Sequence, residues 1–266
     1  MARSSSFRDV VSEGFGTLAL VTQRLVPFEG VHNFRDLGGY ETDDGRHTRW
    51  GRLYRSDAMH DLTDDDLEVF RTLGIAAIVD LRSPAEIQRT GRGLIENEPH
   101  RFVSAPVLSN YATNEPRSVV DENYLTRRYL QYLDVGAPAF VSVFEEMTNE
   151  ENYPLVFNCF LGKDRTGVVA ALVLSCLGVR RTRVIEDYAF SDERMVHIVA
   201  KLLRDPDLRD EIEGDDPILL SARADTMANF LFALDERFGG AVPWAESVGV
   251  APASIARVRD LLLDED

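Results

Sequence analysis

The feature of this sequence that most constrains its fold is a repeated order of short apolar runs and helical patterns. Residues 75–83 (IAAIVDLRS) form the clearest apolar run, and its β-branched residues are typical of a buried strand. The preceding residues, 61–74, predict a helix that follows Thr63 as its N-cap and stops at Gly74. A helix therefore leads directly into a buried strand.

The same order continues along the chain. Ser83, Pro84 and Glu86 have the spacing of a capping box, which predicts that a helix opens directly after the strand. Further strands are expected at 101–107 and 154–159, and further helices at 124–133, 137–147 and 165–177. Strands separated by helices predict an α/β fold with a mainly parallel central sheet flanked by helices. Ligands of such sheets bind beyond the carboxyl ends of the strands, which is where Cys159 falls.

The two ends of the chain are simpler. Residues 1–24 look like a tail or an appended helix, and the chain beyond residue 178 has helical patterns. Two apolar stripes stand out there: Met195, Val199 and Leu202 in one, and Met227, Phe230, Leu231 and Leu234 in the other. Such stripes are typical of ordinary core contacts.

Charge and cysteine content exclude several classes of protein. The 266 residues carry a formal net charge of -16, which argues against a nucleic-acid binder because phosphate backbones attract a basic face. Two cysteines, Cys159 and Cys176, rule out a disulfide scaffold. Without a CxxC motif, and with scattered histidines, no metal site is expected.

Location follows from what the sequence lacks. The first residues have no compact apolar core or cleavage site of a secretory signal, so a cytoplasmic protein is expected, with unconventional export left open. The longest apolar runs are too short to cross a bilayer, and no stable membrane insertion is expected.

One stretch, residues 157–167 (FNCFLGKDRTG), can be interpreted in two ways. A nucleotide-binding loop needs a glycine five places before Gly162, but that position is Phe157. It also needs a hydroxyl residue after Lys163, where this chain has Asp164. An acidic side chain would repel phosphates, so this interpretation is rejected.

The second interpretation is a cysteine, five residues and an arginine, which suits the hydrolysis of a phosphate monoester. Cys159 ends a strand and leads into a helix, whose N-terminus favours a thiolate. Arg165 supplies a planar fork for two phosphoryl oxygens, and Thr166 can donate its hydroxyl to the sulfur. The backbone N–H groups of the loop can form a concave anion nest from Phe160 through Leu161 and Gly162.

A structural interpretation exists for each cysteine. A cysteine at the end of a strand is usually a small buried hydrophobe, and the spacing to an arginine is unspecific by itself. The Gly-Lys-Asp inside the loop, the hydroxyl residue behind it and the strand–helix context favour catalysis for Cys159. Cys176 lies within the following helix, roughly 15 Å from the loop, and is expected to be a core residue.

The loop CFLGKDRTG resembles the CxxGKDRTG loop of the bacterial tyrosine phosphatase B-like family. The segments NFRDLGGY, YRSD, DLRS-x-x-E (Asp80 to Glu86) and DYAFS (Asp187 to Ser191) are similar to the same family, and the resemblance runs from about Val26 to the C-terminus. It implies a cysteine-phosphatase fold, with a phosphatase domain over residues 25–266 and a helical lid within about residues 190–236. It also implies dual-specificity and phosphoinositide phosphatase activity.

The resemblance assigns further roles within the loop. It implies that Lys163 is an extra phosphate ligand and that Asp164 is a candidate for the acid and base of catalysis. Asp80 is the second candidate acid, because Asp80 and Arg82 follow a strand whose carboxyl end could face the same pocket. A structural ion pair between these two residues is the alternative.

One matching segment is weak evidence by itself, and one residue departs from the family pattern. The NFRDLGGY segment alone indicates a turn with positive φ at residues 37–39 and a structural pair of Arg35 with Asp36. The family usually has histidine before the nucleophile, whereas this chain has Asn158. Asparagine can brace the loop but never carries charge, so a functional but altered enzyme is expected.

The predicted function is hydrolysis of phosphate monoesters of the tyrosine and dual-specificity type, through a phosphocysteine and without a cofactor. The expected partner is a phosphorylated protein or a small phosphomonoester. A phosphatase for phosphoinositides or small phosphorylated metabolites is the first alternative. A module that captures phosphate without turnover is the second, and the intact Cys159 and Arg165 argue against it.

Overall fold

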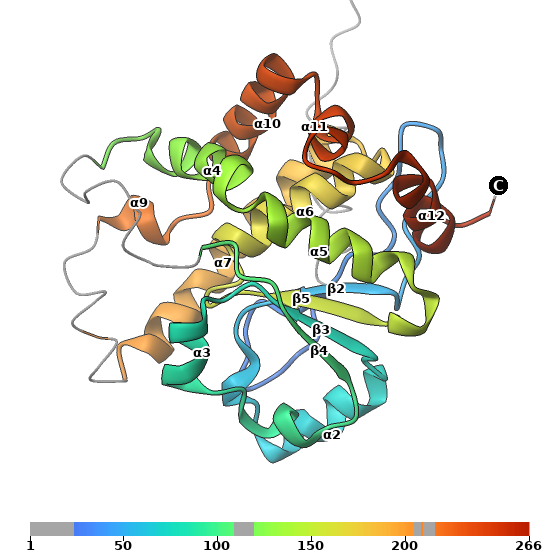
Figure 1. The fold of residues 1–266 in the computed structure, drawn as a ribbon. Helices are drawn as coiled ribbons and strands as arrows, with labels where there is room; N and C mark the ends of the chain where they lie inside the picture. The colour runs from blue at the N-terminus through green and yellow to red at the C-terminus, as the bar shows by residue number, and fades with distance from the viewer. Residues whose placement is uncertain (1–23, 109–119, 205–208, 210–215, 266) are drawn as a thin grey trace, which may run out of the picture.

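The computed structural model describes residues 24–108, 120–204, 209 and 216–265 (Figure 1). The strands of its sheet are β1 (Arg35–Asp36), β2 (Leu53–Ser56), β3 (Ala77–Asp80), β4 (Arg101–Ser104) and β5 (Leu155–Asn158). The helices are α2 (Asp64–Leu73), α3 (Pro84–Thr90), α4 (Tyr124–Val135), α5 (Ala137–Thr148), α6 (Asp164–Leu177), α7 (Arg181–Leu202), α9 (Pro217–Leu220), α10 (Ala224–Phe238), α11 (Ala241–Ser247) and α12 (Pro252–Leu262). Short 3-10 turns are η1 (Met59–Asp61), η2 (Gly93–Asn97) and η5 (Glu150–Asn152).

The sheet has the strand order β1-β2-β5-β3-β4. The edge strand β1 is antiparallel to β2, and the other pairs are parallel, which confirms the mainly parallel sheet. β5 lies in the middle, where Asn158 is in register with Ser56 of β2 on one side and Asp80 of β3 on the other. The carboxyl ends of three strands therefore meet next to residue 159.

Alternate residues of the strands pack on opposite faces of the sheet, as the pleat requires. Leu155 and Phe157 of β5 face the thicker layer, which contains α4, α5, α6, α10, α11 and α12. Val156 faces the other side, toward α2 and the segment that precedes β1. Figure 1 shows the thicker layer above the sheet and α2 below it. Helices thus cover both faces, as a parallel sheet needs.

The predicted signals for the ends of α2 and α3 are confirmed. The Thr63 hydroxyl accepts the Asp66 amide, and the Asp66 carboxylate accepts the Thr63 amide. Gly74 ends α2 in the left-handed conformation with a φ of 62°. Ser83 and Glu86 form the same reciprocal box at the start of α3. Local sequence alone accounts for these helix ends.

The expected lid, about residues 190–236, begins inside α7, which is one continuous helix. The expected lid also takes in α9 and most of α10, while residues 205–208 and 210–215 lie outside the described residues. Met227, Phe230, Leu231 and Leu234 of α10 belong to the main core, so this stripe has the ordinary packing role. The lid itself stays a prediction. The expected tail lies outside the described residues except for Arg24.

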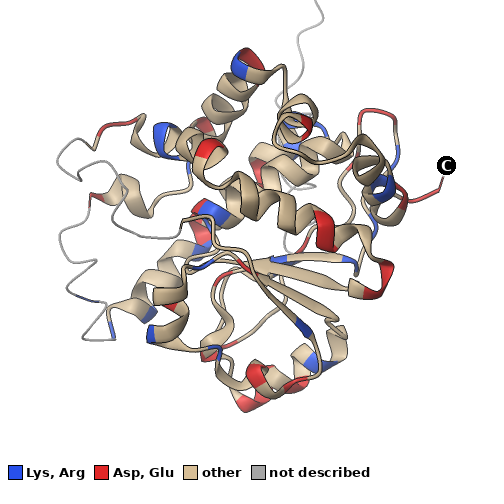
Figure 2. Cartoon of the chain, viewed as in Figure 1, with Lys and Arg blue, Asp and Glu red and all other residues tan. Residues whose placement is uncertain are grey.

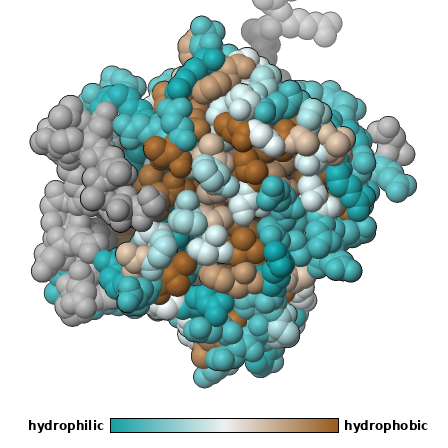
Figure 3. Space-filling view, in the orientation of Figure 1, coloured by the Kyte–Doolittle hydropathy of each residue, from teal (hydrophilic) through white to brown (hydrophobic). Residues whose placement is uncertain are grey.

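The outside of the molecule is polar and rich in acidic groups. Figure 2 shows acidic residues in many parts of the chain, with one run on the first turn of α2, from Asp64 to Asp66. In Figure 3, apolar side chains show between the helices of the thicker layer. Among the described residues, no helix combines the length and apolar character that a membrane span requires.

Candidate active site

The sheet places Cys159 directly after its central strand. β5 ends at Asn158, and Cys159 follows at the carboxyl edge with 1% of its surface exposed. The loop then runs to Lys163, and α6 begins at Asp164. The positive end of this helix's dipole therefore lies at the end of the loop, where an anion is stabilised.

The carbonyl groups of this loop are bound by the protein body. Phe160 O accepts the Ala58 amide at 3.1 Å, Leu161 O accepts Asn33 Nδ2 at 3.3 Å, and Gly162 O accepts Arg55 Nη2 at 2.7 Å. The C=O and N–H groups of a trans peptide unit point in opposite directions. The N–H groups of residues 161–163 therefore point away from these partners, as the predicted anion nest requires.

The bend of the loop depends on a glycine. Gly162 has a φ of 66°, and a Cβ added to it would lie 2.5 Å from the backbone nitrogen of Asp57. A side chain at this position would clash with backbone that cannot move freely. The close approach of the loop to the end of β2 thus explains why glycine stands here.

Arg165 is fixed by a bidentate ion pair. Its Nη1 and Nη2 each donate to one carboxylate oxygen of Glu86, both at 2.7 Å. Burial alone would raise the pKa of Glu86, but the hydrogen bonds and the charge of Arg165 lower it to about 2. The sequence identifies Glu86 as part of a capping box and of the family motif from Asp80 to Glu86, but not as the partner of Arg165. Its second role could not be seen because the two residues are 79 positions apart.

Replacing Glu86 by glutamine should weaken the fold above pH 4.5, with little effect near pH 2, and should also slow the reaction. The folded pKa of about 2 lies below the ordinary 4.5, so the pair stabilises the fold above pH 4.5 and loses this effect as the pH falls toward 2. Urea titrations measure the free energy of unfolding at each pH. Between pH 4.5 and 2, this free energy should fall less steeply in Glu86→Gln than in the wild type, by up to about 1.4 kcal/mol per pH unit. We expect kcat/KM at pH 7 to fall about 10²-fold, because the guanidinium loses its orientation.

Ser83→Ala is the matched control, because it removes the cap hydroxyl and keeps the Glu86–Arg165 pair. It should cost about 1 kcal/mol of stability with kcat/KM retained. Equal losses of kcat/KM in both variants would mean that Glu86 acts only through the helix cap.

Lys163 points toward the region of the expected lid. Its side chain is fully buried, and Nζ donates to the carbonyl oxygens of Leu219 at 2.6 Å and Ser221 at 2.9 Å. These carbonyls belong to the end of α9 and the residue that caps it. A role as phosphate ligand requires the ammonium to leave them, and this role stays a prediction.

Asp164 is held by neighbours on two sides. Its Oδ1 accepts the hydroxyl of Tyr129 at 2.7 Å and lies 3.3 Å from Lys163 Nζ. Burial alone would raise the pKa of Asp164, but the charges of Lys163 and Arg128 and the Tyr129 hydrogen bond keep it below its usual range. The carboxylate form is therefore favoured in this arrangement.

The remaining predicted residues lie behind the loop. The carboxylate of Asp80 accepts Arg82 Nη2 at 2.6 Å, and both side chains are buried, which is the ion pair expected as the alternative. Asn158 Nδ2 lies 3.4 Å from Asp80 Oδ1 and so links the start of the loop to β3. The fully buried Thr166 has its hydroxyl 3.5 Å from Ser56 O. The catalytic roles of Asp80 and Thr166 stay predictions.

Two buried arginines brace the loop from below. Arg35 Nε donates to Asp187 Oδ1 at 2.9 Å, and Arg55 pairs with the other carboxylate oxygen of Asp187. Burial alone would raise the pKa of Asp187, but the two guanidinium groups hold it well below the usual range. Because Arg55 also donates to Gly162 O, this network connects α7 to the turn of the loop.

The prediction that Arg35 pairs with Asp36 was wrong. Asp36 accepts the backbone amides of Gly38 and Gly51, both at 2.7 Å. Neighbouring strand residues point to opposite faces of the sheet, so the side chains of Arg35 and Asp36 cannot pair with each other. The positive φ expected for the following turn occurs at Gly39, with a value of 71°.

The apolar stripe of α7 covers the loop rather than the main core. A separate cluster contains Met195, Ile198 and Leu202 of α7, with Phe160, Leu161, Val199 and Leu220 packed against it. The two apolar stripes therefore have different packing roles. The stripe of α10 fills the main core, and the stripe of α7 covers the residues that follow the nucleophile.

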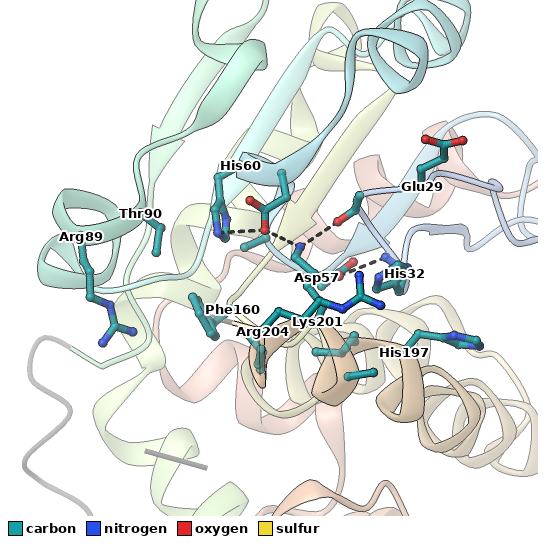
Figure 4. A pocket seen from close by; sticks show the side chains of 16 residues that line it. Glu29, His32, Asp57, His60, Arg89, Thr90, Phe160, His197, Lys201 and Arg204 are labelled. Atoms are coloured by element: carbon teal, nitrogen blue, oxygen red, sulfur yellow. Dashed lines mark hydrogen bonds and ion pairs between the residues drawn. The ribbon is translucent and has the colours of Figure 1, made fainter. Parts of the chain in front are cut away.

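A pocket of about 740 Å³ lies beside the loop (Figure 4). Its walls come from the end of α7, the η1 turn, the end of α3 and residues 29–32. Three positively charged side chains line it, Arg89, Lys201 and Arg204, together with His32, His60 and His197. Burial lowers the pKa of His32, and it lowers the pKa of His60 to about 4, so these two rings are neutral at pH 7. Three acidic side chains line it as well: Glu29, Asp57 and Asp61.

The pocket adjoins the residue after the nucleophile. The ring of Phe160 lies 6.1 Å from the ring of His60 and 5.8 Å from Cζ of Arg89. Within this lining, Lys201 Nζ forms an ion pair with Asp61 Oδ2 at 2.5 Å. In a chain of net charge -16, the charges of Arg89, Lys201 and Arg204 beside the loop could bind an anionic group.

Known proteins similar to this chain are phosphatases. A model described as the tyrosine phosphatase family matches residues 26–264. The triple specificity protein phosphatase PtpB of Mycobacterium tuberculosis is 27% identical over 88% of this chain and 97% of its own length. A putative tyrosine-protein phosphatase of Cupriavidus necator is 33% identical over 63% of each chain. Among solved structures, the catalytic core of Siw14 covers 86% of this chain and 96% of its own, with 16% identity and a TM-score of 0.41.

Proposed function

The chain belongs to the tyrosine phosphatase family, and we propose that the loop from Cys159 to Arg165 hydrolyses phosphate monoesters through a phosphocysteine. One observation supports this most directly. The carbonyl groups of the loop are bound by the protein body, so its amides point the other way, while Glu86 fixes the fork of Arg165. A nest and a planar fork together can hold the oxygens of a phosphoryl group throughout its transfer.

The proposed reaction has two steps. In the first, the Cys159 thiolate forms a bond to phosphorus, the bond to the leaving oxygen breaks, and that oxygen takes a proton from the protonated form of Asp164. In the second, water forms a bond to phosphorus, and the phosphorus–sulfur bond breaks with its electron pair returning to Cys159. The Asp164 carboxylate takes the proton of the water, which restores both groups.

A second candidate substrate class is supported by the basic pocket. A phosphoinositide or a small phosphorylated metabolite with a second anionic group could place that group among the basic side chains beside Phe160. A phosphotyrosine without a second anionic group would gain nothing from them. The two classes therefore predict different effects of removing one pocket charge.

Arg204 provides that test, because it is exposed at the end of α7 and lines the pocket. Arg204→Gln should raise KM about tenfold for an inositol bisphosphate and leave KM for p-nitrophenyl phosphate unchanged, since losing one charged contact costs about 1.4 kcal/mol. Arg223→Gln removes a comparably exposed arginine away from the pocket and should change neither KM. Unchanged KM values for both substrates in Arg204→Gln would contradict the second class and leave phosphotyrosine and dual-specificity substrates.

Location and remaining partners stay predictions. A cytoplasmic location is an expectation, and the formal net charge of -16 supports the expectation that nucleic acids are not substrates.

A further inference from the structure

Two buried tyrosines form a hydrogen-bonded chain that ends on Asp164. The hydroxyl of Tyr129, from α4, lies 2.7 Å from Asp164 Oδ1 and 2.7 Å from the hydroxyl of Tyr188, from α7. Both tyrosines are fully buried. Three helices far apart in the sequence thus meet at the first residue of α6.

The direction of the chain follows from counting hydrogens. An ionised carboxylate only accepts hydrogen bonds, and each phenol has one hydrogen to donate. Tyr129 must therefore donate to Asp164, and Tyr188 must donate to Tyr129. Hydrogen bonds that point the same way along a buried chain polarise and strengthen one another.

The chain is suited to hold a carboxylate rather than to supply a proton. Burial raises the pKa of Tyr129 well above the ordinary value for tyrosine, and the nearby charge of Asp164 raises it further. Both hydroxyls therefore keep their protons at neutral pH. Tyr188 also packs against the backbone of α6, since a Cβ added to Gly167 would lie 2.9 Å from its ring.

We propose that Tyr129, backed by Tyr188, is a positioning residue that holds the Asp164 carboxylate for proton transfer. The proposal rests on the acid and base role given to Asp164 above. The hydroxyl of Tyr129 bonds to Asp164 and Tyr188, so its effect on the reaction is expected to pass through Asp164.

The test is a cycle of Tyr129→Phe, Asp164→Asn and the double variant. Tyr129→Phe should lower kcat about tenfold on an alkyl phosphate and less on p-nitrophenyl phosphate, whose leaving group needs little protonation. Losing a hydrogen bond to the carboxylate raises the pKa of Asp164. The alkaline limb of kcat/KM should therefore move up by about one pH unit. In the Asp164→Asn background, Tyr129→Phe should have no further effect.

Two controls separate positioning from plain packing. Tyr188→Phe should also move the alkaline limb of kcat/KM to higher pH, but by less than Tyr129→Phe, because Tyr188 is one hydrogen bond further from Asp164. Tyr153→Phe removes a buried hydroxyl that donates to Met147 O, remote from Asp164, and should leave the limb where it is. Equal losses from Tyr129→Phe with and without Asp164, or an unmoved limb, would overturn the proposal.

The underlying role of Asp164 is tested separately by the single variant. If Asp164→Asn lowers kcat equally on alkyl and aryl phosphates, Asp164 is not the acid, and the positioning proposal is overturned with it. Phosphate would still be found on Cys159, so the covalent mechanism is not affected by that result.

Discussion

Replacement of Cys159 by serine is expected to lower kcat by about 10⁴-fold or more while the protein still folds and binds oxyanions. A serine hydroxyl is far less acidic than a thiol, so it is a much weaker nucleophile at neutral pH. The amide groups of the loop and the Glu86–Arg165 pair do not depend on the sulfur. Phosphate release from a phosphotyrosine peptide and the binding of vanadate would measure the two properties.

The same experiment identifies the intermediate. Acid quenching of the wild-type protein with a labelled substrate should leave phosphate on the peptide that contains Cys159. Cys176→Ser is the control: burial raises the pKa of Cys176 to about 12, so it is not a nucleophile at neutral pH. This variant should keep its activity at some cost in Tm, since it buries a hydroxyl in the core. Label on the Cys176 peptide, or turnover by Cys159→Ser, would contradict the covalent mechanism.

Replacement of Asp187 by asparagine is expected to have the largest effect on stability. It removes the one carboxylate that Arg35 and Arg55 share and leaves two guanidinium groups buried without it. Breaking a buried pair in this way costs about 3–5 kcal/mol. Because Arg55 also holds Gly162 O, kcat should fall together with the free energy of unfolding. Urea unfolding at pH 7, with kcat measured on the same samples, would test both.

Asp44→Asn is the matched control, because Asp44 also contacts two arginines, Arg46 and Arg259, but at the surface. Exposed pairs contribute about 0–1 kcal/mol, so this variant should be close to wild type in stability and activity. If Asp187→Asn were equally mild, the network below the loop would not be what holds it in place.

The sequence by itself determined the features that depend on neighbouring residues. The caps at Thr63 and Ser83, the stop at Gly74 and the order of strands and helices are local patterns, and the structure confirms them. The position of Cys159 followed from the same reasoning, because a parallel sheet brings the carboxyl ends of its strands to one edge. The spacing of cysteine and arginine then indicated phosphate chemistry before any distance was known.

Only the tertiary structure decided which charged groups meet. Glu86 reaches Arg165 across 79 positions, Arg35 reaches Asp187 across 152, and Tyr129 reaches Asp164 across 35. A sequence pattern suggests the nearest residue of opposite charge as the partner, which is why it predicts a pair of Arg35 with Asp36. The correct partner is the one that the folded chain brings to the same buried space, where an unpaired charge would be too costly to keep. Local patterns fix how each segment folds, but the pairing of buried charges depends on how the segments pack together.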